Sequence, residues 1–105
     1  MNANEAEKMM EQARVMQKRI DEIQQALNLR RFEATSGGGM VRAVVTGALR
    51  VVAIEIEDAF FKSGDKEMIQ DLAAAAINAA IVKAQEGAHA EFVRMQQHLT
   101  TGSGF

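Results

Sequence analysis

The sequence of 105 residues contains no cysteine, no proline, no tryptophan and no tyrosine. Without cysteine there are no disulfides and no thiolate metal ligands, which fits a reducing cytoplasm. With no tyrosine or tryptophan, and with five phenylalanines that suit packing, the chain lacks aromatic platforms for stacking single-stranded nucleic acid. No apolar run approaches the roughly 20 residues that span a bilayer, and the acidic opening segment is unlike a signal peptide. We therefore expect a cytoplasmic protein with no membrane partner.

Groups that converge for catalysis are missing as well. His89 and His98 are nine residues apart, about 180° around a helix, so they cannot share a metal ion within one chain. No Ser/His/acid arrangement supplies a nucleophile. The glycines of Ser36–Gly39 lack the Lys-Ser/Thr pair that follows a phosphate-binding loop. We predict that the protein is not an enzyme and takes no cofactor, no metal and no small-molecule substrate.

Neither sign of charge dominates, because 12 basic residues stand against 14 acids, for a formal net charge of -2. Proteins that hold DNA by neutralising phosphates usually present net positive charge. DNA binding by this chain would therefore need a local basic surface on an acidic background.

The first element present is an amphipathic helix over about residues 4–28. Its apolar residues recur every three or four positions, which is the helical period, and Asn2 or Asn4 can cap its start. This apolar stripe, which predicts a packing surface, consists of Met9, Ala13, Met16, Ile20, Ile23 and Leu27.

The middle of the chain predicts three strands, at 29–35, 40–46 and 49–57, with the Ser36–Gly39 turn between the first two. Gly47-Ala48 suits a two-residue type II′ turn with Gly47 at its first central position. In the third strand, Val52, Ile54 and Ile56 alternate with residues that face the other way. One face of the sheet should therefore be covered, and the other should be partly exposed to solvent.

A second long helix is predicted over residues 66–99, after a short helical turn at 58–62, with Asp65 as its N-cap. The small side chains of Ala73–Ala76 allow a sheet or helix to approach closely, and Gly87 marks a bend or a close contact. The apolar stripe of this helix consists of Ile69, Ala73, Ile77, Ile81, Ala84, Ala88, Phe92, Met95 and Leu99. The glycine-serine tail after it, residues 101–105, should fray.

The length of this helix bears on assembly. Thirty-four residues extend roughly 50 Å at 1.5 Å per residue, whereas a compact domain of this size has a radius of gyration near 13 Å. The first helix is the expected partner for the uncovered stripe within the chain. A symmetric homodimer with projecting paired helices would cover what remains.

Three blocks of the sequence resemble the YbaB/EbfC family of bacterial nucleoid-associated proteins. These are the Met/Gln-rich first helix, the segment 36–47 (SGGGMVRAVVTG) and the segment 70–80 (QDLAAAAINAA). The resemblance implies one α+β domain over residues 1–105 with the order helix-strand-strand-strand-helix, a small antiparallel sheet and two long projecting helices. It also implies a dimeric, tweezer-like shape and DNA binding by the terminal helices. The chain departs from the family in having Asp58-Ala59 where a proline is common.

The residues predicted to contact DNA are basic and lie on the two helices. Counted from Met9, Lys18 lies about 180° and Arg14 about 140° around the first helix, so both face away from its stripe. The alternative is a solvated surface with ordinary ion pairs. The predicted contacts, all to phosphates of double-stranded DNA with little sequence preference, are Arg14, Lys18, Arg19, Lys83 and Arg94.

Two questions stay open at this stage. Arg30, Arg31 and Arg42 form a basic patch if strand pairing brings them together, or they pair across strands with Glu33, Glu55 or Glu57. The function is DNA binding in the nucleoid or, alternatively, a scaffold that grips a protein partner by apolar helix tips. Methionine-rich surfaces adapt to many partners, and those tips carry Met9, Met10, Phe92 and Met95.

Overall fold

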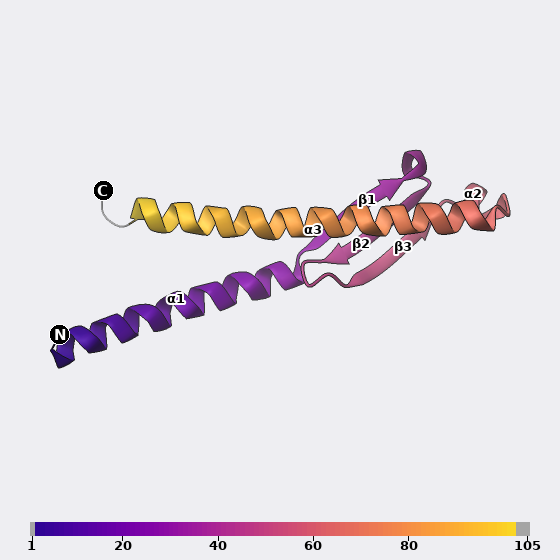
Figure 1. The fold of residues 1–105 in the computed structure, drawn as a ribbon. Helices are drawn as coiled ribbons and strands as arrows, with labels where there is room; N and C mark the ends of the chain where they lie inside the picture. The colour runs from indigo at the N-terminus through magenta and orange to yellow at the C-terminus, as the bar shows by residue number, and fades with distance from the viewer. Residues whose placement is uncertain (1, 103–105) are drawn as a thin grey trace.

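A computed structural model describes the backbone of residues 2–102 and the side chains of residues 2–98. Its elements are α1 (Ala3–Leu29), β1 (Arg31–Ser36), a 3-10 turn (Gly37–Gly39), β2 (Val41–Thr46), β3 (Val51–Ile56), α2 (Asp58–Lys62) and α3 (Lys66–Gly102). This order confirms the predicted α+β fold of helix, three strands and helix (Figure 1). The last helix runs three residues beyond the predicted end, and tail residues 103–105 lie outside the described residues.

The ends of α1 follow ordinary capping chemistry. The side chain of Asn2 accepts a hydrogen bond from the backbone N–H of Glu5 at 2.9 Å, which identifies Asn2 as the cap. At the other end, Arg30 adopts an extended conformation and its N–H donates to the carbonyls of Ala26 and Leu27. The helix therefore extends to Leu29, and the first strand begins two residues later than predicted.

The sheet is antiparallel throughout, in the order β1-β2-β3. The predicted type II′ turn at Gly47-Ala48 is wrong. The N–H of Leu49 donates to the carbonyl of Thr46, and Thr46 pairs with Arg50, so the loop contains three residues. Leu49, with φ of 61°, takes the left-handed conformation that a type I turn with a bulge requires. A second irregularity, between Val44 and Val45, leaves Val52 as an extra residue in β3.

The core lies between α3 and the sheet, where α3 packs across β1 and β2. Its deepest helical residues are alanines one turn apart, and Ala76 and Ala80 have no exposed surface. Because alanine side chains are short, the helix axis approaches the strands closely, as the small residues of this segment predicted. Gly87 serves the same contact, since a Cβ there would lie 2.4 Å from the Phe32 ring. The buried cluster comprises Ala34, Val41, Ala43, Val45, Phe60, Ala76, Ala80 and Ala84.

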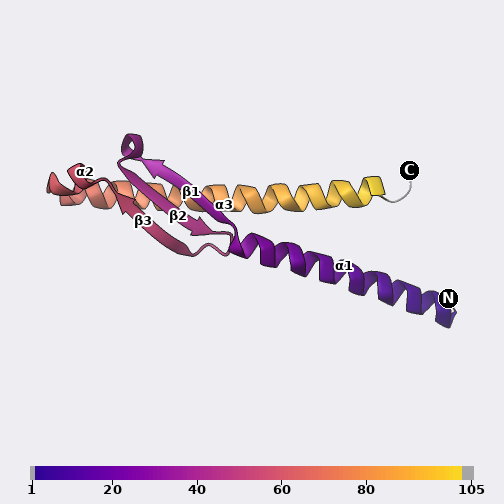
Figure 2. The ribbon, with the colours of Figure 1, turned by 180° about the vertical axis from the view of Figure 1, so that it is seen from behind.

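The molecule is elongated, measuring 73 × 24 × 16 Å with a radius of gyration of 20.9 Å. Both long helices extend past the same end of the sheet, and they diverge toward the chain termini (Figures 1 and 2). The expectation that α1 covers α3 within one chain is therefore wrong. Met9 and Ile20 of the predicted stripe are exposed, and Leu27 is the one buried residue of α1. None of the described helices is both long enough and apolar enough to cross a bilayer.

Candidate nucleic-acid interface

Charge is unevenly distributed along the projecting helix α1. Residues 14–31 contain five basic side chains and two acidic ones, whereas residues 2–13 contain three acids and one lysine. The basic segment covers the half of α1 that adjoins the sheet and the first residue of β1. This segment is therefore net positive, although the whole chain has a formal net charge of -2.

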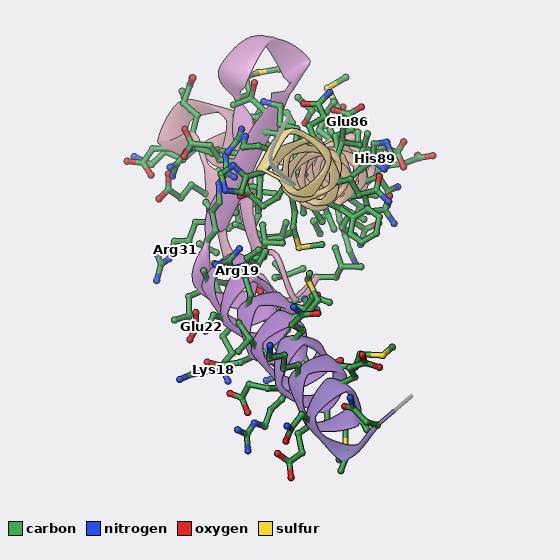
Figure 3. The ribbon with its side chains drawn as sticks, turned by 90° about the vertical axis from the view of Figure 1, so that its left-hand side faces the viewer. Lys18, Arg19, Glu22, Arg31, Glu86 and His89 are labelled. Carbon is green, nitrogen blue, oxygen red and sulfur yellow. The ribbon has the colours of Figure 1, made fainter. Side chains whose placement is uncertain are left out.

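Two predicted residues, Lys18 and Arg19, are exposed and form no ion pair with any described residue. Figure 3 shows Lys18 and Arg31 projecting from the same side of the molecule, with Glu22 between them. Arg31 is exposed because β1 directs it away from the face that α3 covers. These cations are available to an external anion without breaking an internal contact.

Arg14 and Arg94 are occupied by acids of their own helices. Arg14 pairs with Glu11, three residues earlier on the same helix. Arg94 pairs with Glu91 at 2.9 Å with the same spacing. Exposed pairs of this kind are worth only a few tenths of a kcal/mol, so they compete with a phosphate without excluding it.

Lys83 has a contact that the sequence did not predict. Its Nζ donates a hydrogen bond to the backbone carbonyl oxygen of Glu33 at 3.0 Å. Glu33 lies on β1, an edge strand of the sheet, so Lys83 ties α3 to that edge. An edge strand presents unpaired carbonyls, and Lys83 satisfies one of them.

The basic patch of Arg30, Arg31 and Arg42 does not form, and the alternative of cross-strand pairing is confirmed for Arg42. Its guanidinium donates to the carboxylates of Glu33 and, at 2.8 Å, Glu55. Hydrogen bonds to Glu33 and then to Glu55 raise the pKa of Arg42 above its ordinary range. Arg30 instead stacks on the Phe32 ring, 4.9 Å from its centroid.

A groove lies between the projecting helices α1 and α3 near the sheet, and we call it the arm groove. It has two adjoining hollows that share Ile23 and Glu91, one lined also by Arg19, Arg94, Met95 and His98, the other also by Ala26, Leu27 and Arg30. The fold thus brings together Arg19 and Arg94, two predicted contacts that are 75 positions apart. It adds Arg30 and Glu91, which sequence reasoning did not place there because the position of α3 beside the end of α1 is a tertiary property.

Comparison with known proteins agrees with this architecture. The model of the YbaB/EbfC DNA-binding family matches residues 1–99. A nucleoid-associated protein of Thermoanaerobacter sp. strain X514 is 40% identical over 87 residues, covering 83% of this chain and 78% of that protein. One from Pelotomaculum thermopropionicum is 39% identical over 92 residues, 88% of each. The crystal structure of an uncharacterized Helicobacter pylori protein shares the fold, with a TM-score of 0.69 at 22% identity over 91% of this chain and 98% of that one. The chain belongs to the YbaB/EbfC DNA-binding family.

Proposed function

We propose that the protein binds double-stranded DNA in the bacterial nucleoid as a homodimer, through phosphate contacts and with little sequence preference. The observation that carries the proposal is the basic segment of α1, where Lys18 and Arg19 are exposed without an ion-pair partner among the described residues. Contacts to phosphates position a protein on DNA but carry no sequence information. The main proposed contacts are Lys18 and Arg19. Arg14 and Arg94 contact phosphates as well, once their ion pairs with acidic side chains break.

The homodimer is proposed from the composition of α3. In residues 72–84 the only polar side chains are Asn78 and Lys83, and a helix that is apolar all round is normally buried. The sheet covers one face of this helix, whereas the outward face is exposed at Ala75, Ala79 and Val82. A second copy packed on that face would cover it and would present two basic segments to one duplex in a tweezer-like arrangement.

The DNA proposal is tested by fluorescence anisotropy of a labelled random-sequence duplex at low and at physiological salt. We expect affinity that falls steeply with salt, because each phosphate contact releases counterions. The variant with Lys18→Gln and Arg19→Gln should lower the low-salt affinity about ten-fold. It should also reduce the slope of log affinity against log salt concentration by the equivalent of roughly two phosphate contacts per protomer.

The matched control removes two positive charges elsewhere, by Lys62→Gln and Lys66→Gln at the opposite end of the molecule (Figure 1). It should change affinity less than two-fold, by about what the altered net charge alone does. Equal losses in the two double variants would contradict binding by α1. Absence of binding at low salt would contradict the function itself.

The dimer is tested separately by light scattering at micromolar concentration. The unmodified protein should be a dimer, and Ala79→Glu, which places a charge on the outward face of α3, should be a monomer that keeps its helical circular dichroism. The control Ala59→Glu, at an exposed position of α2, should remain dimeric. A monomeric unmodified protein would overturn this part of the proposal.

A scaffold function remains the second candidate, since the helix tips carry exposed apolar residues. Met10 is 72% exposed and Phe92 is 51% exposed, and such a surface suits a protein partner. Salt separates the two functions, because apolar binding persists at salt concentrations that abolish phosphate contacts.

A further inference from the structure

The arm groove combines three arginines, from α1 with its C-cap and from α3, with one acid. Arg19 of α1, Arg30 at the end of α1 and Arg94 of α3 line its two hollows, and Glu91 is the acid that lines both. Among the described residues, Arg94 is the only one of the three arginines that forms an ion pair with Glu91. The groove therefore has the composition of an anion site that already contains a carboxylate.

The side chains of Glu91 and Arg94 differ in how much of their surface is exposed. The side chain of Glu91 is 27% exposed, whereas that of Arg94 is 73% exposed. The carboxylate is the more enclosed of the two groups, and the guanidinium is largely open to solvent. The pair between Glu11 and Arg14 differs, because both side chains there are more than half exposed and the hollow beside them is lined by one arginine and a second acid, Glu7.

We propose that Glu91 is an affinity-setting residue of the DNA site, which holds Arg94 in an internal ion pair that a DNA phosphate has to displace. This inference rests on the proposed DNA binding. A phosphate and a carboxylate form the same charge-assisted hydrogen bonds with a guanidinium, so they compete for Arg94. Glu91 therefore lowers the affinity for DNA, so that bound DNA dissociates more readily.

The test is the variant Glu91→Gln, which keeps the size of the side chain and removes its charge. We expect its affinity for the random-sequence duplex at low salt to rise about five-fold. The slope of log affinity against log salt concentration should steepen by the equivalent of about one phosphate contact per protomer, as Arg94 becomes free to bind phosphate. The control is Glu86→Gln, which removes the same charge from α3 on a side turned away from α1 (Figure 3). It should raise affinity less than two-fold.

A double-mutant cycle with Arg94→Gln separates the ion pair from general electrostatics. In the Arg94→Gln background, Glu91→Gln should raise affinity by no more than Glu86→Gln does. An undiminished five-fold rise in that background would overturn the proposal. Thermal melts followed by circular dichroism check that all four proteins are folded to the same extent.

The outcomes distinguish this inference from the function on which it rests. If the unmodified protein binds DNA and Glu91→Gln binds no more tightly than Glu86→Gln, the role of Glu91 is refuted and DNA binding stands. If neither the unmodified protein nor Glu91→Gln binds at low salt, the proposed function is refuted, and the inference fails with it.

Discussion

Gly47 packs directly against the backbone of Leu27: a Cβ atom on Gly47 would lie 1.8 Å from the Leu27 carbonyl oxygen. The N–H of Gly47 also donates to the carbonyl of Arg30 at 2.9 Å. The last turn of α1 is therefore seated on the β2–β3 loop, and this junction sets the direction in which α1 leaves the sheet. Because Lys18 and Arg19 lie on that helix, the junction also positions the proposed DNA contacts.

Gly47→Ala should destabilise the protein by about 3 kcal/mol, since the added methyl meets backbone atoms that cannot move independently. Chemical denaturation measures the change. DNA affinity of the folded fraction should also fall, because α1 has to tilt to relieve the overlap. The comparison is Gly38→Ala, where φ is 67° but no atom lies within 4 Å of the new Cβ. That variant should lose roughly 1–2 kcal/mol from backbone strain alone and keep its DNA affinity. Equal losses in both variants would mean that close approach at Gly47 is unimportant.

Gly87→Ala tests the contact between α3 and β1. In an ordinary helix interior this change stabilises by about 1 kcal/mol. Here the new Cβ would lie 2.4 Å from Cε1 and 2.8 Å from Cζ of Phe32, and the ring is also stacked against Arg30. We expect a net loss of about 1–2 kcal/mol in the free energy of unfolding.

The same substitution should change sign when the ring is removed. In a Phe32→Leu background, Gly87→Ala should stabilise by about 1 kcal/mol, because the smaller side chain leaves room for the methyl and the intrinsic helix preference remains. A loss of equal size in both backgrounds would place the cause outside the Gly87–Phe32 contact.

Lys83→Gln separates the structural contact of Lys83 from a DNA contact. Loss of the hydrogen bond to the Glu33 carbonyl should cost about 1 kcal/mol of stability, because an edge carbonyl loses a charged donor but stays accessible to water. DNA affinity should fall less than two-fold, compared with about three-fold or more for Lys18→Gln. A larger loss of affinity for Lys83→Gln than for Lys18→Gln, measured by anisotropy, would indicate that Lys83 contacts DNA.

Local signals in the sequence predicted the elements well, because helical and strand periods reflect the chain's own geometry. The helix at 66–99 and the alternation of Ile54 and Ile56 with Glu55 needed no tertiary information. Val52, which the alternation placed on the same face, is instead the extra residue in β3. The direction of α1 depends on how closely Gly47 approaches Leu27, which no periodicity encodes. For the same reason the apolar stripe of α1 predicted packing but not that this chain leaves half of its residues exposed.

The charged residues were harder to assign than the apolar ones. Strand register decides that Arg42 lies beside Glu33 and Glu55, and the sequence allowed both that pairing and a basic patch. The bond from Lys83 to the Glu33 carbonyl joins residues 50 positions apart. Side-chain charges at such separations acquire partners only through the fold, so their roles had to come from the structure.

The β2–β3 loop contains a leucine in the left-handed backbone conformation, which residues with a Cβ disfavour. Replacing it should stabilise the protein. Leu49 has φ of 61° and is 46% exposed, so it bears the left-handed penalty of roughly 1–2 kcal/mol without being part of the buried core. Leu49→Gly removes that penalty but adds about 0.5–1 kcal/mol of unfolded-state entropy, for an expected net gain of about 0.5–1 kcal/mol in chemical denaturation. Leu49→Ala keeps the Cβ and should give no gain. If alanine stabilises as much as glycine, the benefit comes from removing an exposed apolar side chain, and the loop is not strained at Leu49.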